Sequence, residues 1–323
     1  MRTSSICLTV FAALLLGVPA VATAKKTAKE DRGYIVYGKG KALWKVPANT
    51  RKGDEATKIA SLGFAARRVV AIKASSDGSA FLVSTDKNHY WVKPVAAAKN
   101  GDVKVVRHVC RGHASMSQNG MTVLCQTETG EISLESMSEG GTKKTTTIVG
   151  AMATIAKNRV TEVVVAAGSG IEAVAVAEPT TKTTLSVHAP TSHLLVAPDG
   201  KRAVAVFPDD VNGTSVFGFL LDGKGVKRKL VTDAIPVAWS SDSKWLAVTR
   251  KKRACVVRSA GGQYRCFDGY RALGMSPDNN DALLASGKQS ALKIFRADLG
   301  GARSSKPVLL VKRAQGAAVW LAP

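Results

Sequence analysis

Short apolar segments alternate with polar turns along most of this chain. In residues 236–249 an apolar strand leads into the turn Ser240-Ser-Asp-Ser243, and a second apolar strand follows it. Similar turns recur at Ser75-Ser-Asp-Gly78, Ser117-Gln-Asn-Gly120, Ala156-Lys-Asn-Arg159, Ala197-Pro-Asp-Gly200 and Ser276-Pro-Asp-Asn279. Because short apolar runs bounded by turn residues favour strands, and no stretch keeps a helical period, the pattern predicts an all-β protein.

The spacing of these turns predicts how the strands are arranged. Their Asp or Asn residue recurs at positions 77, 119, 158, 199, 242 and 278, which is every 36 to 43 residues. A period of about 40 residues with several short strands per unit is typical of a β-propeller, in which each repeat forms one four-stranded blade. We therefore predict a seven-bladed β-propeller, with six blades as the alternative if the weak fourth unit, 151–189, merges with a neighbour.

The two ends of the chain are expected to meet in one blade. Three apolar segments near the N-terminus, at residues 34–37, 42–46 and 58–62, have no Ser-Asp strand before them. The segment 317–323 resembles the first strand of the repeat at residues 236–240. A C-terminal strand that completes the N-terminal blade would close the ring and remove exposed sheet edges. Residues 25–323 are thus expected to form a single propeller domain.

The N-terminal segment has the features of a signal peptide. Arg2 supplies a positive charge, residues 8–21 are apolar, and Ala22-Thr-Ala24 provides small residues before a cleavage point. The apolar run is shorter than the roughly 20 residues that a membrane span needs. We expect residues 1–24 to be removed, no membrane span to remain, and the protein to be periplasmic or secreted in a Gram-negative-type envelope.

Export to an oxidising compartment predicts that the remaining cysteines form disulfides. A hairpin that turns at Ala260-Gly261 places Cys255 opposite Cys266, within disulfide reach. Cys110 and Cys125 flank the first strand of one blade and can pair across it. Four cysteines allow three connectivities, of which we predict 110–125 and 255–266. A metal site is less favoured, because no Cys-x-x-Cys spacing occurs.

The charge of the chain predicts an anionic partner. The sequence holds 46 basic and 24 acidic residues, a net charge of +22. Outside the cytoplasm such a partner is an envelope protein or an anionic polymer such as lipopolysaccharide, and no motif for nucleic acid is present. The loops between second and third strands share one face of a propeller with the loops between blades. The basic residues that we place on this face are Lys39, Lys41, Arg67, Arg68, Arg111, Arg250, Lys251, Lys252, Arg253, Arg271, Lys312 and Arg313.

Two of the repeats resemble those of a known family. Trp239-Ser-Ser-Asp-Ser-Lys-Trp-Leu-Ala-Val248 and Met275-Ser-Pro-Asp-Asn279 are similar to the W-S-P-D-G-K-x-L-A repeat of the TolB-type, WD-like propellers of bacteria, and Arg296-Ala-Asp-Leu-Gly-Gly301 is similar to their D-L-x-G-G segment. The α/β domain that precedes the propeller in TolB has no counterpart in this sequence. The resemblance implies an interaction platform in the cell envelope.

Candidate catalytic and metal-binding residues are few. The turn Asp and Asn residues recur, so we expect them to hold their turns through hydrogen bonds to backbone N–H groups. The histidines, at positions 89, 108, 113, 188 and 193, lack the spacing of a zinc site. We therefore predict no catalytic residue, no metal and no cofactor, and a monomeric, non-enzymatic binding or scaffold module. The alternatives are a carbohydrate-active lyase or hydrolase centred on the channel, and a purely structural ring.

Overall fold

The computed structural model describes most of the chain after the N-terminal segment. The described residues are 32–50, 56–62, 69–85, 88–94, 103–138, 141–150, 152–155, 162–167, 170–186, 188, 190, 192–209, 213–224, 227–288, 290–300 and 306–323. The predicted signal peptide, residues 1–24, lies outside this set. Within it no residue is helical, and no helix is long and apolar enough to cross a membrane.

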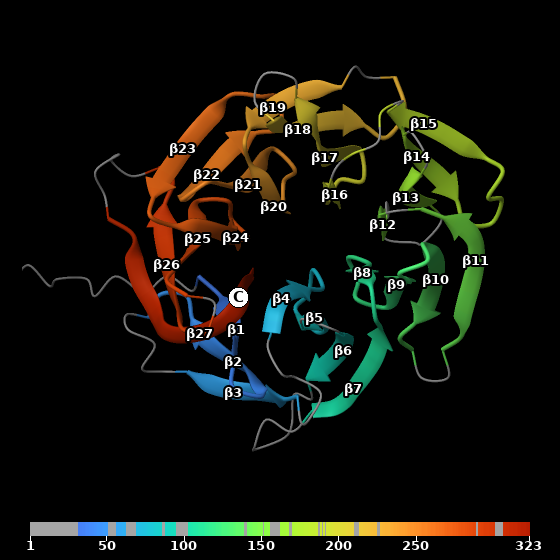
Figure 1. Ribbon diagram of the computed structural model, residues 1–323. Helices are drawn as coiled ribbons and strands as arrows, with labels where there is room; N and C mark the ends of the chain where they lie inside the picture. The colour runs from blue at the N-terminus through green and yellow to red at the C-terminus, as the bar shows by residue number, and fades with distance from the viewer. Residues whose placement is uncertain are drawn as a thin grey trace, which may run out of the picture. The chain divides into compact units, whose positions relative to one another are not determined.

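Antiparallel β-strands follow one another along the whole described part of the chain (Figure 1). The first ten are β1 (Tyr34–Lys39), β2 (Ala42–Pro47), β3 (Thr57–Ser61), β4 (Val69–Ala74), β5 (Phe81–Thr85), β6 (His89–Pro94), β7 (Val103–Cys110), β8 (His113–Met116), β9 (Thr122–Gln126) and β10 (Glu131–Ser136). The next nine are β11 (Lys143–Val149), β12 (Met152–Ile155), β13 (Glu162–Ala167), β14 (Gly170–Ala175), β15 (Lys182–Ser186), β16 (Ser192–Val196), β17 (Arg202–Asp209), β18 (Gly213–Leu220) and β19 (Arg228–Thr232). The last eight are β20 (Ile235–Trp239), β21 (Trp245–Arg250), β22 (Arg253–Arg258), β23 (Gln263–Asp268), β24 (Arg271–Met275), β25 (Asp281–Ser286), β26 (Leu292–Asp298) and β27 (Val308–Leu321).

The strands form a ring of sheets, and the number of separate blades differs from the prediction. Five four-stranded blades are present in the described residues: β4–β7, β8–β11, β12–β15, β16–β19 and β20–β23. The remaining strands form one seven-stranded sheet in the order β24-β25-β26-β27-β1-β2-β3. The expectation of seven blades, or of six, is therefore wrong.

A single long strand explains this difference. The first half of β27 pairs with β26, for example Leu309 with Phe295, and its second half pairs with β1, as Trp320 does with Ile35. Hydrogen bonding therefore continues from β24 to β3 without a break. Turn spacing counts repeats, but it does not show whether two successive repeats share one strand.

Apolar side chains between neighbouring sheets hold the ring together. One cluster contains Val204 and Val206 from β17 together with Leu246 and Val248 from the next blade, all at most 3% exposed. A second cluster joins Val36 of β1 to Val83 of β5. Each sheet thus buries both of its faces, which removes apolar surface from water and accounts for the nearly continuous apolar second strands.

The recurring turn residues have the structural role that the sequence predicts. The Asp77 carboxylate accepts a hydrogen bond from Ser75 Oγ at 2.6 Å and another from the Ser79 backbone N–H at 3.0 Å. These bonds lower the pKa of Asp77, the Ser75 hydroxyl contributing most. The same Ser-to-Asp bond occurs between Ser240 and Asp242 at 2.7 Å. Asn158, the weakest copy, lies outside the described residues.

Candidate functional site

The innermost strands enclose a cavity at the centre of the ring. Its volume is about 590 Å³, within the range of small-molecule sites. Residues of β4, β8, β12, β16, β20 and β24 line it together with the C-terminal half of β27. Residues of the Ser-Asp turns, such as Gln118, Pro198 and Pro277, also line the cavity. The cavity therefore extends to the face formed by the turns between first and second strands, which we call the turn face.

Equivalent positions on the inner strands contribute different chemistry to the cavity wall. The next-to-last residue of each of the six shorter inner strands lines the cavity, in chain order Lys73, Ser115, Thr154, Leu195, Ala238 and Gly274. Among these, Ser115 Oγ and Thr154 Oγ1 lie 3.1 Å apart and share a hydrogen bond. Lys73 is thus the single charged side chain at this level of the described wall.

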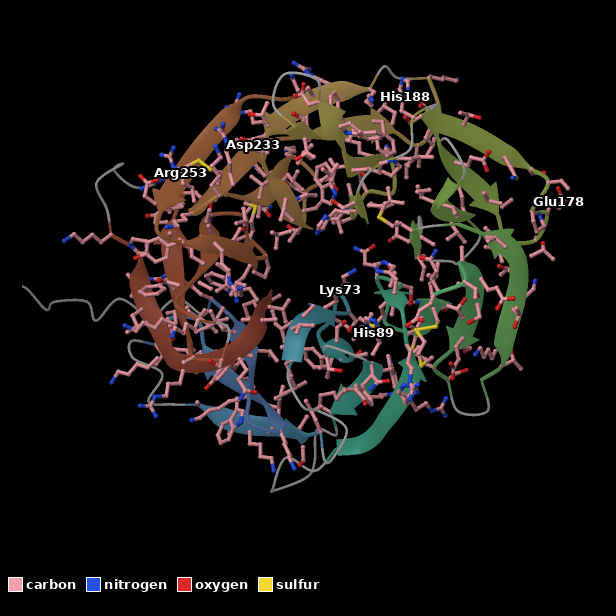
Figure 2. The ribbon with its side chains drawn as sticks, in the orientation of Figure 1. Lys73, His89, Glu178, His188, Asp233 and Arg253 are labelled. Atoms are coloured by element: carbon pink, nitrogen blue, oxygen red, sulfur yellow. A yellow bond between two sulfur atoms is a disulfide. The ribbon has the colours of Figure 1, made fainter. Side chains whose placement is uncertain are left out.

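Lys73 is an isolated cation. Figure 2 shows it on β4, at the inner edge of the ring. Its side chain still reaches solvent, but the surrounding protein disfavours its charged form, and this burial lowers its pKa. No carboxylate of the described residues forms an ion pair with it. Among the described residues, the one acidic residue that lines the cavity is Asp199, which belongs to the repeated turn at Ala197-Pro-Asp-Gly200.

Two histidines, His89 and His113, lie close enough to Lys73 for its positive charge to lower their pKa values. Burial is the main cause that lowers the pKa of His113 to about 4, and the positive charges of Lys73 and His89 add to it. Burial also lowers the pKa of His89, whose ring nitrogens contact Ser84 Oγ at 2.8 Å and the Gly112 carbonyl oxygen at 2.7 Å. Both imidazoles are therefore neutral near pH 7 and leave Lys73 as the local positive charge.

The basic residues predicted from the sequence lie at the opposite end of the strands. Their turns join second to third strands or connect successive blades, and together these turns make what we call the basic face. Lys39 and Lys41 lie at the β1–β2 turn, Arg111 between β7 and β8, and Lys251 and Lys252 at the β21–β22 turn. Arg250, Arg253 and Arg271 lie at the ends of strands on the same face. Lys312 and Arg313 lie within β27 next to Ala314, which pairs with Leu292 at the start of β26. Arg67 and Arg68 lie outside the described residues.

The structure divides these residues into paired and unpaired cations. Lys251 forms an ion pair with Asp233 at 3.3 Å, and Arg253 forms one with Asp268. Arg271 donates a hydrogen bond to the Gly316 carbonyl oxygen at 3.0 Å. Lys39 lies over the Trp44 ring, 5.2 Å from its centroid. Arg111, Lys252, Lys312 and Arg313 are exposed cations that make no ion pair with a described residue. The basic face therefore carries less uncompensated charge than its sequence suggests.

Both predicted disulfides are present. Cys110 and Cys125 join β7 of one blade to β9 of the next, with their Cα atoms 6.0 Å apart. Cys255 and Cys266 face each other across the β22–β23 hairpin, with a Cα–Cα distance of 4.1 Å. One bond thus connects neighbouring blades and the other closes a hairpin. Among the described residues no group of three or more His, Cys, Asp or Glu side chains is placed to hold a metal ion.

Sequence reasoning missed Lys73, although a signal was present. In the segment Val70-Ala-Ile-Lys-Ala74 a lysine interrupts an otherwise apolar inner strand. A charge in such a strand either faces solvent or lines a cavity, and the strand pattern alone does not distinguish these two positions.

The comparisons with known proteins agree with the fold. Neither a family model nor a curated protein matches the sequence. A functionally unknown protein from Desulfotomaculum acetoxidans is similar in structure, with a TM-score of 0.61 and 13% identity over 90% of this chain and 99% of that one. The hydrazine synthase of Kuenenia stuttgartiensis has a TM-score of 0.53 and 17% identity over 75% of this chain and 81% of that one.

A third similar structure is named as a propeller. The β-propeller domain of Cps50 (Swd1) from Myceliophteria thermophila has a TM-score of 0.53 and 11% identity, and the match covers 77% of this chain and 88% of that one. Together with the ring of sheets, these likenesses show that the described part of the chain has a β-propeller fold. At such identities they concern the fold alone.

Proposed function

We propose that this protein is an exported, non-enzymatic β-propeller of the TolB-like, WD-like kind that binds an anionic polymer of the bacterial envelope as a monomer. The observation that carries the proposal is the group of unpaired cations on the basic face, Arg111, Lys252, Lys312 and Arg313. Exposed charges of one sign raise the local concentration of an oppositely charged partner and steer its approach. The net charge of +22 acts in the same direction.

Other features support the export and the binding role. Two disulfides are the kind of bond that persists in oxidising compartments. Propellers present many turns on a rigid ring, which suits them to docking a partner. The alternative is a carbohydrate-active enzyme centred on the channel, and its hydrolase form requires a pair of carboxylates on either side of a sugar. The described cavity wall offers only Asp199, so the binding role is the better supported one.

The test measures binding of the mature chain, residues 25–323, to immobilised lipopolysaccharide at low and at high salt. One variant replaces Arg111, Lys252, Lys312 and Arg313 with serine. A matched variant replaces Lys143, Lys144, Lys201 and Lys224, which are exposed residues near the opposite ends of the strands. Both variants lose the same net charge, so they differ only in where that charge lies.

We expect the wild type to bind at low salt and to be released as salt screens exposed charges. The basic-face variant is expected to bind about tenfold more weakly, whereas the matched variant changes affinity by less than about threefold. Equal losses in the two variants would show that net charge alone is responsible, and absence of binding by the wild type would refute a polymer of this kind as the partner.

A further inference from the structure

The central cavity has the size and wall of a small-molecule site, and it is separate from the basic face. It is lined on the turn face by Gln118, Pro198 and Pro277, whereas the cations of the basic face belong to turns at the other ends of the strands. A ligand in the cavity would therefore contact residues that the proposed docking surface does not use. The two sites can be tested independently.

The described part of the wall contains one positive charge that forms no ion pair with a described residue. Lys73 lies at the inner edge of the ring, and the protein around it lowers the pKa of its ammonium group (Figure 2). The side chain is exposed at the cavity wall, so its ammonium group is accessible to a ligand, and a negatively charged partner there would stabilise its charged form. The nearby His89 and His113 do not supply a negative charge, since each is neutral or positive. An anionic group on a ligand would supply the missing partner.

One part of the wall is suited to the apolar body of a ligand. Leu195, Val237 and Trp239 line the cavity, and the Trp239 indole N–H is already bonded to the Leu195 carbonyl oxygen at 3.3 Å. The hydroxyl groups of Ser115 and Thr154 bond to each other at the level of Lys73. Each hydroxyl can also accept or donate a second hydrogen bond to a ligand.

We infer that the central cavity binds a small organic anion, with its carboxylate on the Lys73 ammonium group, the Ser115–Thr154 pair beside it, and its apolar body against Leu195, Val237 and Trp239. A volume of about 590 Å³ accommodates a ligand of this class. A charge-assisted hydrogen bond in a partly desolvated site is stronger than one between neutral groups, so the anionic group fixes the orientation of the ligand.

The same wall disfavours other occupants. A cation would meet the positive charge of Lys73, and the described residues hold no cluster that could ligate a metal ion. An extended polyanion would need several positive groups, but the described cavity wall has one. The cavity wall therefore fits a ligand that has a single negative charge and an apolar body.

The probe for the experiment is 4-phenylbutyrate, and its neutral counterpart is 4-phenylbutyramide. Both have the same apolar body, so the ratio of their affinities measures the contribution of the negative charge. We would titrate each into the mature chain, residues 25–323, by isothermal calorimetry. The carboxylate is expected to bind at least about tenfold more tightly than the amide, the usual gain from a hydrogen bond to a charged group.

Three single-residue variants test whether Lys73 is the residue responsible for the preference for carboxylate over amide. Lys73→Met keeps the length of the side chain and is expected to abolish the preference, whereas Lys73→Arg keeps it. Lys252→Met, a loss of the same charge on the basic face, is expected to leave the preference unchanged. Thermal unfolding of each variant shows that it is folded.

Three results would overturn the inference: no binding of the carboxylate to the wild type, equal binding of carboxylate and amide, or a preference that persists in Lys73→Met. A preference lost in Lys252→Met would instead place the anion on the basic face. None of these results depends on whether the protein binds lipopolysaccharide.

Discussion

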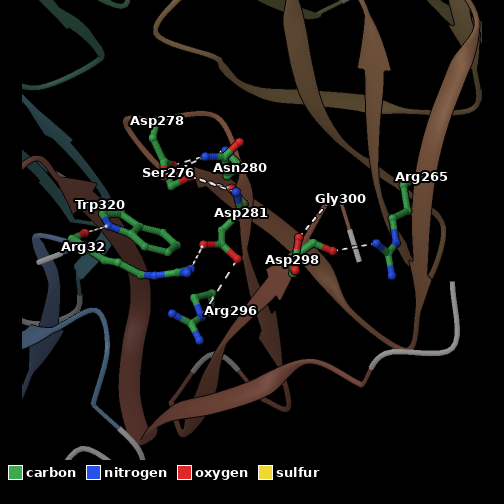
Figure 3. Close-up of polar contacts among 10 residues, drawn as sticks. All are labelled: Arg32, Arg265, Ser276, Asp278, Asn280, Asp281, Arg296, Asp298, Gly300 and Trp320. Carbon is green, nitrogen blue, oxygen red and sulfur yellow. Dashed lines mark hydrogen bonds and ion pairs between the residues drawn. The ribbon is translucent and has the colours of Figure 1, made fainter. Parts of the chain in front are cut away.

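Arg32 and Asp281 form an ion pair between residues that are 249 positions apart in the sequence. Arg32 Nη1 donates a hydrogen bond to Asp281 Oδ2 at 2.8 Å (Figure 3). The Arg32 carbonyl oxygen accepts a hydrogen bond from the Trp320 indole N–H at 2.7 Å. The segment before β1 is thus fixed to β25 and to the end of β27, where the two ends of the described chain meet.

The first prediction concerns this ion pair. The Asp281 carboxylate is only 2% exposed, burial raises its pKa, and its Oδ1 has no hydrogen-bond partner, with Arg296 Nε 4.0 Å away. Because Arg32→Ala leaves a buried carboxylate poorly compensated, we expect the free energy of unfolding to fall by about 1–3 kcal/mol. Denaturant unfolding of Arg32→Ala, Asp281→Asn and the double variant measures it. Additive effects of the two substitutions would show that the pair contributes nothing specific.

The second prediction concerns the glycine at the corner of β27. Gly316 has a φ of 65°, and a Cβ atom there would lie 1.6 Å from the Val69 carbonyl oxygen. We expect Gly316→Ala to lower the free energy of unfolding by about 3 kcal/mol or more, since backbone must move. Gly40→Ala is the matched control, because Gly40 has a φ of 61° with nothing near its Cβ position. It should cost about 1 kcal/mol. Equal costs in the two variants would contradict the close approach of β27 to β4.

The third prediction concerns the disulfides. The bonds 110–125 and 255–266 close loops with separations of 15 and 11 residues. Restricting the unfolded chain in this way stabilises the folded state, so we expect replacement of either pair by serine to cost about 2–4 kcal/mol. Denaturant unfolding of the two double variants measures this cost. A chain that unfolds identically with and without reductant would contradict a stabilising role for both bonds.

The fourth prediction concerns pH. The pKa of His113 is lowered to about 4, so between pH 6.5 and 4 the unfolded chain binds a proton at this residue that the folded chain does not. Stability is therefore complete above pH 6.5 and decreases as the pH falls toward 4. His113 retains solvent exposure, which reduces the size of the effect.

The variant His113→Gln isolates this contribution from those of other groups. His89 and His193 also have lowered pKa values and act with the same sign, while the Ala153 backbone bond to His113 acts against the shift. We expect the variant to lose less stability than the wild type when denaturant unfolding is repeated at pH 7 and at pH 4.5. Identical losses would show that His113 is not the group responsible.

The sequence predicts those contacts of this protein that form between residues close together in the chain. The pairing of Cys255 with Cys266 follows from the register of one hairpin, since residues on either side of a short turn face each other. The bond from Ser75 to Asp77 follows from two residues of the same turn. The repeated turns also predict an all-β ring, because each repeat must cover the apolar faces of its neighbours.

The tertiary structure alone decides two other features. The first is the seven-stranded sheet, which exists because β27 continues as one strand past Ala314 and pairs on both sides, which turn spacing does not specify.

The position of Lys73 is the second of these features. A strand pattern alternates its two faces with a period of two, so it shows that Lys73 and Ile72 point in opposite directions. It does not show which direction leads into a cavity. The sequence by itself therefore determined the strand repeat, the turns and the disulfides, which are local. Only the tertiary structure shows the seven-stranded sheet that closes the ring and the position of Lys73 at the central cavity. Both depend on contacts between residues far apart in the chain.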